Sequence, residues 1–445
     1  MDRKCFKSII LTVILALFAG SLAACSGGAG SRDAAAAPDN RQEAGSEPAG
    51  TVQSPAKTVE LKYYGWNDEK SYLEPAVEAF NAQSSNIKVT STFMVPEDYY
   101  VKALTMISSG NADFDLYSVN GIDKLNQYQQ VKGLVDLTPL IKDKNIDVSK
   151  YGPSIQSLKV EDKYYALPYR TSCYAIFYNK DIFDKAGIPY PENLTWEEYA
   201  AIALKLTTGS GQDKVWGGFI ADWIRAPFMT VQKDSNLLDD DMSTITCWLE
   251  YLNRLYNVDK SHMSFAEMKT TKTDWIKIFE SGKVAMLPNG EWTVSMLNAD
   301  KAAGNHNINW DIASLPVINK GDTVKSLGGV STFMGIYSGS KNTQAAFDFI
   351  DFVCGEKGAK LLAEKGVLTA FVNDEVKKAF KASAGVSGAD ALLTPETYTE
   401  AQPIPQMAAV FQAYDEEKEL YLTKQESIGE FSKNFAAKRE NALKD

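Results

Sequence analysis

The chain has 445 residues, of which 44% are hydrophobic and 23% are charged, so it is long enough to form more than one hydrophobic core. Its 46 basic and 57 acidic side chains give a formal charge of −11, which disfavours nucleic acid as the main partner. With only two histidines, the sequence excludes most serine–histidine, cysteine–histidine and zinc chemistry, and a hydrolase would have to use carboxylates.

The first residues predict an export signal. Three basic side chains precede an apolar run that ends near Gly20 and is too short for a comfortable membrane span. Leu22-Ala23-Ala24-Cys25 follows, and small residues directly before a cysteine resemble the bacterial lipoprotein signal. We therefore expect residues 1–24 to be removed and Cys25 to be lipidated. An ordinary secretory signal with an incidental cysteine is the alternative.

The segment after Cys25 is expected to be a tether. Residues 26–57 consist almost entirely of small, polar and acidic residues and contain no aromatic side chain. Such a composition cannot bury enough apolar surface to fold, so residues 25–57 are expected to form a lipidated cysteine and a disordered tether. A flexible chain of this length reaches roughly 30 Å, which keeps a folded body close to a membrane.

Strands and helices are expected to alternate at the start of the folded body. Residues 59–64 alternate apolar and polar side chains, and residues 87–94 and 114–119 are also strand-like. Helical spacing begins at Tyr72 and again near Pro96, and Gly110 ends the second helix. Strand, helix, strand, helix, strand in this order argues for a parallel sheet that is covered by helices.

Two loops follow the carboxyl ends of these strands, where ligands collect in such sheets. The first carries Trp66, Asn67 and Asp68, and the second carries Asn120 and Gly121. These residues offer an aromatic face and short hydrogen-bonding side chains. The alternatives are that Asn67 or Asp68 caps a helix and that Trp66 fills the core.

A segment near the middle of the chain carries a specific resemblance. Residues 163–188 are rich in aromatic side chains and include Tyr178-Asn179-Lys180-Asp181. This segment resembles the extracellular solute-binding proteins of ABC importers, family 1, the group that includes the maltose-binding proteins. The resemblance implies a strand that crosses from one lobe to the other and ends at this signature, followed by a helix. Thr195 and Glu198 independently predict the start of the next helix, because they form a capping box.

Three further segments match the same family in the same order, so the resemblance covers most of the chain from 59 to 443. Residues 282–292 resemble the strand and turn that place a Trp, here Trp292, in the sugar cleft. Residues 327–347 resemble a glycine-containing strand and its following helix, and residues 403–411 resemble the segment that places another aromatic ring in the cleft. The chain has Phe411 where the maltose-binding members have Trp, and it lacks their acidic and basic pair near Asn120. These departures disfavour maltose itself as the ligand.

The resemblance implies an α/β, two-lobed periplasmic-binding-protein-like fold. Each lobe would be a helix-covered, mostly parallel sheet, and hinge strands would join the lobes. Lobe 1 would contain residues 58–168 plus 317–366, and lobe 2 residues 169–316 plus 367–445. Closure about hinge strands near 169–172 and 315–317 would bury a ligand between the lobes.

The candidate site follows from the chemistry of sugars, which present flat C–H faces and a ring of hydroxyls. The candidate aromatic faces are Trp66, Tyr169, Trp223, Trp292 and Phe411. The candidate polar partners are Asn67, Asp68, Asn120, Arg170, Arg225 and Glu291. For the tryptophans the alternative is core packing, and for Arg225 and Glu291 it is a surface or inter-lobe ion pair.

The sequence shows no nucleotide-binding, zinc-protease or nucleophile-elbow motif, so we expect no catalytic residue, no metal site and no cofactor. We expect a lipoprotein on the outer face of the bacterial cell membrane that captures a mono- or oligosaccharide and delivers it to the permease subunits of an ABC importer. It would act as a monomer and bind no nucleic acid. The alternatives are a lipid-anchored glycoside hydrolase with two carboxylates across an aromatic cleft, and a sensor or adhesion lipoprotein with the same binding fold.

Overall fold

The structure is a computed structural model, and it describes residues 58–225, 228–399, 401–402 and 404–444. The expected signal peptide, Cys25 and the tether 26–57 lie outside the described residues. Within the described ranges, no helix combines the length and the apolar character needed to cross a membrane.

Three parallel strands form one side of the main sheet. β1 (Val59–Trp66) pairs in parallel with β2 (Ile87–Met94) and with β3 (Leu116–Asn120). α1 (Lys70–Gln83) and α2 (Pro96–Ser108) make the crossovers, and Pro96 begins α2 because a helix tolerates proline in its first turn. The predicted order of strands and helices in this region is confirmed, and so is their parallel pairing.

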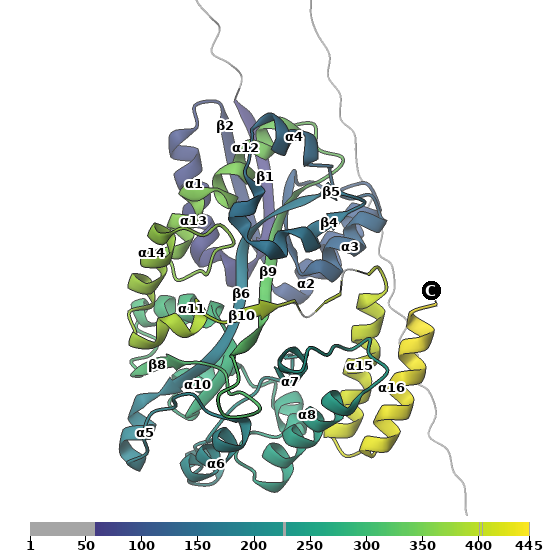
Figure 1. The fold of residues 1–445 in the computed structure, drawn as a ribbon. Coiled ribbons are helices and arrows are strands. Elements are labelled where there is room, and N and C mark those ends of the chain that lie inside the picture. The colour runs from purple at the N-terminus through teal and green to yellow at the C-terminus, as the bar shows by residue number, and fades with distance from the viewer. Residues whose placement is uncertain (1–57, 226–227, 400, 403, 445) are drawn as a thin grey trace, which may run out of the picture. The chain divides into compact units, whose positions relative to one another are not determined.

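The rest of the described chain contains further strands and helices (Figure 1). The strands are β4 (Lys159–Val160), β5 (Lys163–Tyr164), β6 (Ala166–Asn179), β7 (Met286–Gly290), β8 (Trp310–Ala313), β9 (Lys325–Ile336) and β10 (Glu396–Tyr398). The helices are α3 (Ile122–Gln130), α4 (Thr138–Asp143), α5 (Lys180–Ala186), α6 (Trp196–Leu206), α7 (Phe228–Gln232), α8 (Ser243–Asn253), α9 (Phe265–Thr271), α10 (Trp275–Glu280), α11 (Trp292–Ala302), α12 (Thr343–Cys354), α13 (Glu356–Ala363), α14 (Asp374–Ala384), α15 (Met407–Leu422) and α16 (Ile428–Ala442).

Two of the helix starts follow directly from their sequences. The Thr195 side chain accepts a hydrogen bond from the Glu198 backbone N–H, and the Glu198 side chain accepts one from the Thr195 backbone N–H, so the predicted capping box at α6 is confirmed. Asn179 ends β6 and caps α5 through the backbone N–H of Ile182. The strand and helix that the resemblance implied around Tyr178-Asn179-Lys180-Asp181 are therefore present.

The main sheet is mixed. Its strand order is β2-β1-β3-β9-β6-β7, with β10 beside β9 and β8 beside β6. β9 runs antiparallel to β3 and β6, and β6 runs antiparallel to β7 and β8. The expectation of mostly parallel sheets holds for β1 to β3 but not for the second half, because β6 and β9 are long strands that run through both halves in opposite directions.

Two hydrophobic cores lie along these shared strands, which confirms the two-lobed α/β fold. The first core packs around β1, β2 and β3, and the second packs around the end of β6 with β7 and β8. Buried side chains of α15 and α16, including Phe411 and Phe435, join the first core, although residues 367–445 were expected in lobe 2. The lobe boundaries given above therefore remain a prediction.

The chain segments that connect the two cores all cross from one core to the other at the same level of the sheet. On β6, Tyr169 belongs to the first core and Cys173 to the second, and the pairing register with β9 shifts on either side of Arg170. A third segment joins them, because Arg170 pairs with Thr369 and the Thr171 backbone N–H bonds the Leu368 carbonyl. We call the level of residues 169–172, 328–332 and 368–370 the hinge.

The hinge strands approach each other very closely at Gly328. A Cβ atom at this position would lie 1.8 Å from the carbonyl oxygen of Ser172, and the φ of Gly328 is +154°. Only glycine fits there. The second expected hinge, residues 315–317, lies elsewhere: Val317 pairs with Thr195 and Leu315 is buried in the second core, so β9 makes the crossing instead.

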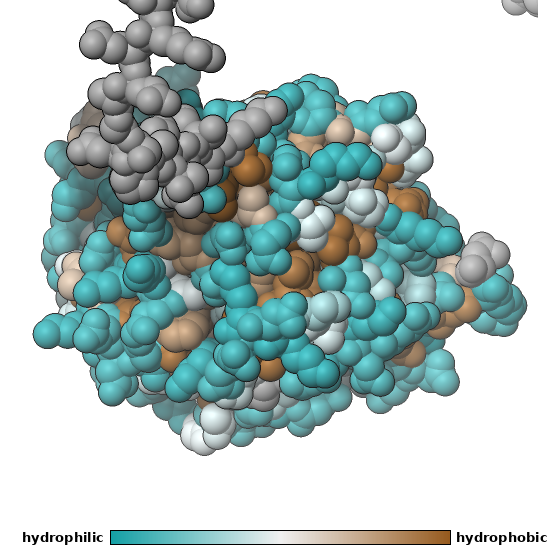
Figure 2. Space-filling model, turned by 90° about the horizontal axis from the view of Figure 1, so that it is seen from above, coloured by the Kyte–Doolittle hydropathy of each residue, from teal (hydrophilic) through white to brown (hydrophobic). Residues whose placement is uncertain are grey.

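The surface is predominantly hydrophilic on the face seen in Figure 2, with smaller hydrophobic patches among the polar residues. Apolar atoms on this scale are ordinary for a protein surface.

Candidate functional site

Three charged side chains meet at the hinge, and we call them the hinge charge cluster: Glu69, Arg170 and Glu291. Arg170 Nη1 lies 3.8 Å from Glu69 Oε1, and Arg170 Nε lies 3.3 Å from Glu291 Oε1. Both carboxylates are 0% exposed, and Arg170 is 8% exposed. Glu69 follows β1 in the first lobe, Arg170 lies on the hinge strand, and Glu291 follows β7 in the second lobe, so the cluster links the two lobes.

Hydroxyl groups complete the surroundings of Glu69. Tyr169 and Tyr72 donate hydrogen bonds to Glu69 Oε1 at 2.6 and 2.9 Å, and Ser118 donates to Oε2 at 3.1 Å. Arg170 Nη1 in turn donates to the Tyr72 hydroxyl at 3.0 Å. The ring of Tyr169 is 1% exposed, so this predicted aromatic face is turned into the protein.

Glu291 is satisfied less completely. One oxygen accepts a hydrogen bond from the Cys173 backbone N–H at 3.2 Å, while Oε1 has no well-aligned donor although Arg170 Nε is close. Burial raises the pKa of Glu291 to about 7, and the neighbouring Arg170 opposes the rise. Burial likewise raises the pKa of Glu69 to about 7, against the lowering effects of Arg170 and the three hydroxyls. The candidate residues Arg170 and Glu291 thus form an ion pair with each other across the lobes.

Three tryptophans of the second lobe gather close to this cluster, and we call them the tryptophan group: Trp223, Trp275 and Trp292. The ring of Trp223 lies 5.8 Å from that of Trp292 and 6.2 Å from that of Trp275, and Trp223 is 43% exposed. Trp292 is half-buried, and the Arg170 guanidinium lies 5.6 Å from its ring centre. One exposed tryptophan ring in contact with two half-buried ones is a suitable platform for an apolar ligand face.

The placement of Trp292 has a local cause. The Asn289-Gly290 step ends β7 rather than forming a separate turn, and Trp292 is the first residue of α11. A Cβ atom at Gly290 would lie 2.1 Å from the Trp292 ring, so the glycine lets the ring fold back over the end of the strand. The ring edge of Tyr174 packs against it at 5.4 Å between ring centres.

The candidate residues of the first lobe lie at the carboxyl ends of β1 and β3. Trp66 is 4% exposed and packs against Tyr99 and Tyr100, with ring centres 5.5 and 5.8 Å apart. Asn120 is half-buried, and its side chain donates a hydrogen bond to the Tyr100 hydroxyl at 2.7 Å. Trp66 therefore packs mainly in the core, as the alternative reading proposed.

Asn67 and Asp68 remain exposed after β1, and neither makes a side-chain cap for the following turn. Partial desolvation raises the pKa of Asp68, while Arg170 lowers it and the carboxylates of Glu97 and Asp274 add to the rise. Asp274 caps α10 directly before Trp275. Asp68 of the first lobe therefore lies close enough to interact electrostatically with Arg170 of the hinge charge cluster and with Asp274, the residue before Trp275.

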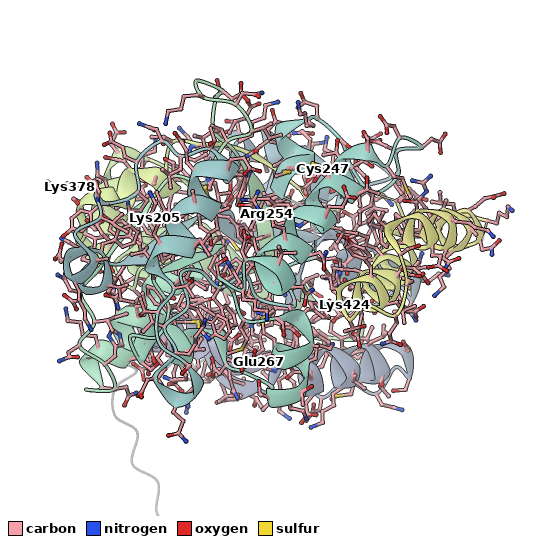
Figure 3. All side chains as sticks on the ribbon, turned by 90° about the horizontal axis from the view of Figure 1, so that it is seen from below. Lys205, Cys247, Arg254, Glu267, Lys378 and Lys424 are labelled. Atoms are coloured by element: carbon pink, nitrogen blue, oxygen red, sulfur yellow. The ribbon has the colours of Figure 1, made fainter. Side chains whose placement is uncertain are left out.

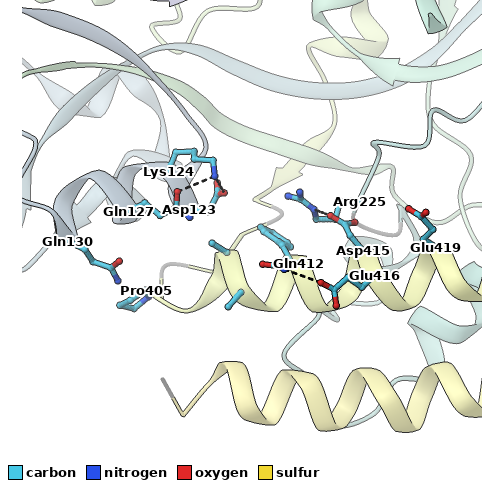
Figure 4. A pocket seen from close by; sticks show the side chains of 13 residues that line it. Asp123, Lys124, Gln127, Gln130, Arg225, Pro405, Gln412, Asp415, Glu416 and Glu419 are labelled. Carbon is cyan, nitrogen blue, oxygen red and sulfur yellow. Dashed lines mark hydrogen bonds and ion pairs between the residues drawn. The ribbon is translucent and has the colours of Figure 1, made fainter. Parts of the chain in front are cut away.

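A pocket of about 670 Å³ lies between α3 and α15, and Figure 4 shows the side chains that line it. Asp123 and Lys124 on α3 are 3.7 Å apart. On the other side, Arg225 Nε donates to Asp415 at 2.7 Å, and its guanidinium lies 4.5 Å from the ring centre of Phe411, which is itself 4% exposed. The volume is within the range of small-molecule sites. We call this feature the α3–α15 pocket.

Sequence reasoning missed several residues of these features, and one of them is Glu69 of the hinge charge cluster. Asp123 and Lys124 were not singled out, and they form an acidic and basic pair at the start of α3. Their position just after the Asn120-Gly121 turn is the signal that could have indicated them, because that turn was already assigned to the ligand edge of the sheet. Trp275 was not singled out, and only its place after the helix cap Asp274 hints at exposure.

The predicted site residues therefore fall into three places. Arg170, Tyr169 and Glu291 lie in or against the hinge charge cluster, Trp223 and Trp292 belong to the tryptophan group, and Arg225 and Phe411 lie at the α3–α15 pocket. Trp66, Asn67, Asp68 and Asn120 lie at the strand ends of the first lobe. Their contact with a ligand remains a prediction. Among the described residues, no group of three His, Cys, Asp or Glu side chains is placed to hold a metal ion.

Two lobes on shared strands, with aromatic and polar side chains gathered where the lobes meet, define a two-lobed ligand-binding protein. The family model described as bacterial extracellular solute-binding protein matches residues 65–360. The chain belongs to this family, whose members are binding proteins that act outside the cytoplasm.

Individual proteins show the same similarity. The melibiose/raffinose/stachyose-binding protein MelE of Bacillus subtilis is 23% identical over 312 residues, which cover 67% of this chain and 70% of that protein. A sugar transporter from Rhizobium etli, solved in an open conformation, is 28% identical with a TM-score of 0.71, covering 86% of this chain and 99% of the other. An ABC substrate-binding protein from Listeria monocytogenes, solved in complex with cycloalternan, has the same fold with a TM-score of 0.74 at 23% identity, covering 87% of this chain and 99% of the other.

Proposed function

We propose that the protein captures an oligosaccharide at the junction of its lobes and delivers it to the permease subunits of an ABC importer. The observation that carries this proposal is the tryptophan group beside the α3–α15 pocket. Residues 223–225 connect the two features, because Trp223 contacts the other tryptophans while Arg225 lines the pocket. A ligand that reaches both needs flat apolar faces at one end and several hydroxyls at the other.

The lining of the pocket suits a neutral, hydroxyl-rich ligand. Gln127, Gln130 and Gln412 offer amides that both donate and accept hydrogen bonds, and the charged residues are present in both signs. Each charged lining residue has a partner of opposite charge: Arg225 pairs with Asp415 and Lys124 with Asp123, while Glu416 and Glu419 pair with Lys438 and Lys269. The sugars in the names of the similar Bacillus and Listeria proteins are oligosaccharides, which agrees with this chemistry.

A binding panel tests the proposal. The purified chain is titrated by calorimetry with melibiose, raffinose, stachyose, maltotriose and glucose, and its thermal unfolding is followed with each sugar. A ligand at about 100 times its dissociation constant should add about 2.7 kcal/mol of stability. The sugar should be recovered unchanged by chromatography, since a binding protein does not turn it over. Cleavage products that disappear on replacement of one carboxylate would support the hydrolase alternative instead.

Delivery to a permease is tested separately in cells. Loss of the gene should abolish import of the sugar that binds in the panel, and uptake should return when the gene is restored. Unchanged import after deletion would favour the sensor or adhesion alternative. We expect the protein to act as a monomer, which light scattering of the purified chain checks.

The membrane anchor is a further part of the proposal. Leu22-Ala23-Ala24-Cys25 supports lipidation of Cys25, which would hold the protein on the outer face of the cell membrane beside its permease and raise their effective concentration. The Cys25→Ser variant should be released from membranes. A variant that stays membrane-bound after a high-salt wash would contradict the anchor.

A further inference from the structure

The hinge charge cluster contains more carboxyls than cations. Glu69 and Glu291 approach one guanidinium, that of Arg170, from opposite lobes. Both carboxyls are 0% exposed, so water does not screen the interaction. With both ionised, the cluster carries one uncompensated negative charge, and with one protonated it is neutral.

The neighbouring titratable groups do not supply the missing positive charge. Those that face the two carboxyls are Tyr63 on β1, Tyr72 on α1, Tyr99 and Tyr100 on α2, and Tyr169 and Cys173 on β6. Burial raises the pKa of every one of these groups, so all of them are neutral between pH 6 and 8.5. Asp68, which interacts electrostatically with Arg170, adds further negative charge when ionised.

The location of the cluster connects its charge to the relative movement of the lobes. Arg170 lies on β6 between the last residue of the first core and the first residue of the second, at the register shifts with β9. A rotation of one lobe against the other therefore changes the distance between Glu69 and Glu291 and their access to water. An arrangement that admits water relieves an uncompensated buried charge.

We propose that Glu69, Arg170 and Glu291 form a proton-dependent lock between the lobes. With one carboxyl protonated, the neutral cluster holds the arrangement described here. With both ionised, the excess negative charge shifts the protein toward an arrangement in which the hinge is more open to water. The consequence for the ligand rests on the proposed function: affinity for a sugar held between the lobes should fall as the pH rises through neutrality.

The lock itself is tested without any ligand, by energy transfer between dyes on the two lobes. One dye is placed on the native exposed Cys247 of α8, on the face shown in Figure 3, and the other on a Glu78→Cys substitution in exposed α1. The labelled variant also carries Cys5→Ser and Cys25→Ser, so that dye cannot attach at these positions. Cys173 and Cys354 stay unchanged, because they are buried and do not react with the dye. α1 and α8 lie at opposite ends of the ribbon in Figure 1.

Transfer efficiency is measured from about pH 6 to about pH 8.5. This range spans the pKa of the two buried carboxyls, which burial raises to about 7. The ligand-free chain should show a titration in this range. Glu291→Gln, which imitates the protonated carboxyl, should reduce the change to less than half, and Glu69→Gln should do the same if Glu291→Gln fails to fold. Glu364→Gln, an exposed carboxyl on the first lobe, should leave the titration intact.

Two results would overturn the lock. One is a constant transfer efficiency over the whole range, and the other is an undiminished titration in a glutamine variant that folds. The variants are essential because Glu426, between α15 and α16, also has a pKa raised to about 7 by burial. Failure of every sugar in the panel would overturn the proposed function and leave this measurement unaffected.

Discussion

The hinge charge cluster and the tryptophan group meet at two consecutive residues, Glu291 and Trp292, but the two groups differ sharply in exposure to solvent. Glu291 is 0% exposed and forms an ion pair and a hydrogen bond with the hinge strand β6. Trp292 is half-buried, and its ring contacts Trp223, which is exposed at the surface. Arg170 touches both groups, since it pairs with Glu291 and lies over the Trp292 ring. Residues of one segment thus link the two lobes through buried charges, and we predict that their more exposed neighbours contact the ligand.

The two groups therefore predict opposite mutational signatures. Changes in the hinge charge cluster should appear first in the free energy of unfolding, because a buried charge loses its partner. Changes in the tryptophan group should appear first in the free energy of binding, because Trp223 is exposed and Trp275 and Trp292 are only half-buried. The following substitutions test this contrast, from the largest expected effect to the smallest.

Arg170→Met should lower the free energy of unfolding by about 3 to 5 kcal/mol, because it leaves two carboxyls buried without their cation. Urea unfolding at pH 8 measures the loss. Arg225→Met is the matched control, since Arg225 is 36% exposed and should cost less than about 1 kcal/mol. If Arg170 were mainly a ligand contact, its variant would unfold like the wild type.

Trp292→Ala should weaken sugar binding by about 2 kcal/mol or more, close to thirtyfold in affinity, as expected for an aromatic anchor. Calorimetric titration with the sugar identified by the panel measures the effect, and denaturant unfolding of the same variant measures the cost to folding. Near-native affinity together with a folding loss of about 3 to 5 kcal/mol would assign Trp292 to the core.

Glu291→Gln should change how stability depends on pH. The pKa of Glu291 is about 7 in the folded protein, above its ordinary value of 4.5, so its contribution to stability is full below pH 4.5 and is lost as the pH rises through 7. Relative to Glu291→Gln, the wild type should therefore lose about 1 to 3 kcal/mol of unfolding free energy between pH 5 and pH 8. Parallel stability curves for the two proteins would show that Glu291 does not titrate in this range.

Trp223→Ala should reduce the binding free energy by about 1 to 2 kcal/mol and leave unfolding within about 0.5 kcal/mol of the wild type. The reason is its exposure of 43%. Trp248→Ala, at 2% exposure, is the control and should instead lose about 3 to 5 kcal/mol of folding free energy. A large folding loss for Trp223→Ala would remove the distinction between the two regions on which the proposed site depends.

Glu416→Gln should have the smallest effect, a loss of less than about 1 kcal/mol of unfolding free energy. Its carboxylate lines the α3–α15 pocket and lies 2.7 Å from Lys438 Nζ, but the two side chains are 48% and 42% exposed and solvent screens the pair. Thermal and urea unfolding at low and high salt measure the difference. A loss as large as that of Arg170→Met would mean that the rim of the α3–α15 pocket is also part of the folded core.

Much of the fold was predictable because its signals are local. Alternation of apolar residues defined β1 and β2, and Thr195 with Glu198 defined the start of α6. The long strands β6 and β9 were predicted from the family resemblance. Their antiparallel pairing was not predicted, because strand direction depends on partners far away in sequence. The crossing at β9 rather than at residues 315–317 is a consequence of the same long-range pairing.

The candidate site was predictable by residue type but not by burial. Arg170 and Glu291 were predicted as polar partners of a ligand, and only the structure shows that they face each other across the hinge. Trp66 and Trp223 have the same side chain, and one is 4% exposed while the other is 43% exposed. Exposure is set by the elements packed above a residue, and a single sequence does not specify those.

The close approach at Gly328 has a mechanical consequence. The backbone of β9 touches that of β6 where a Cβ would lie 1.8 Å from the Ser172 carbonyl, so the strands that connect the lobes are in backbone contact without an intervening side chain. Two lobes joined in this way should move as rigid bodies about short hinge segments. The amplitude and rate of lobe movement then depend on the backbone torsions of the three hinge segments, among them those of Gly328 and Gly329.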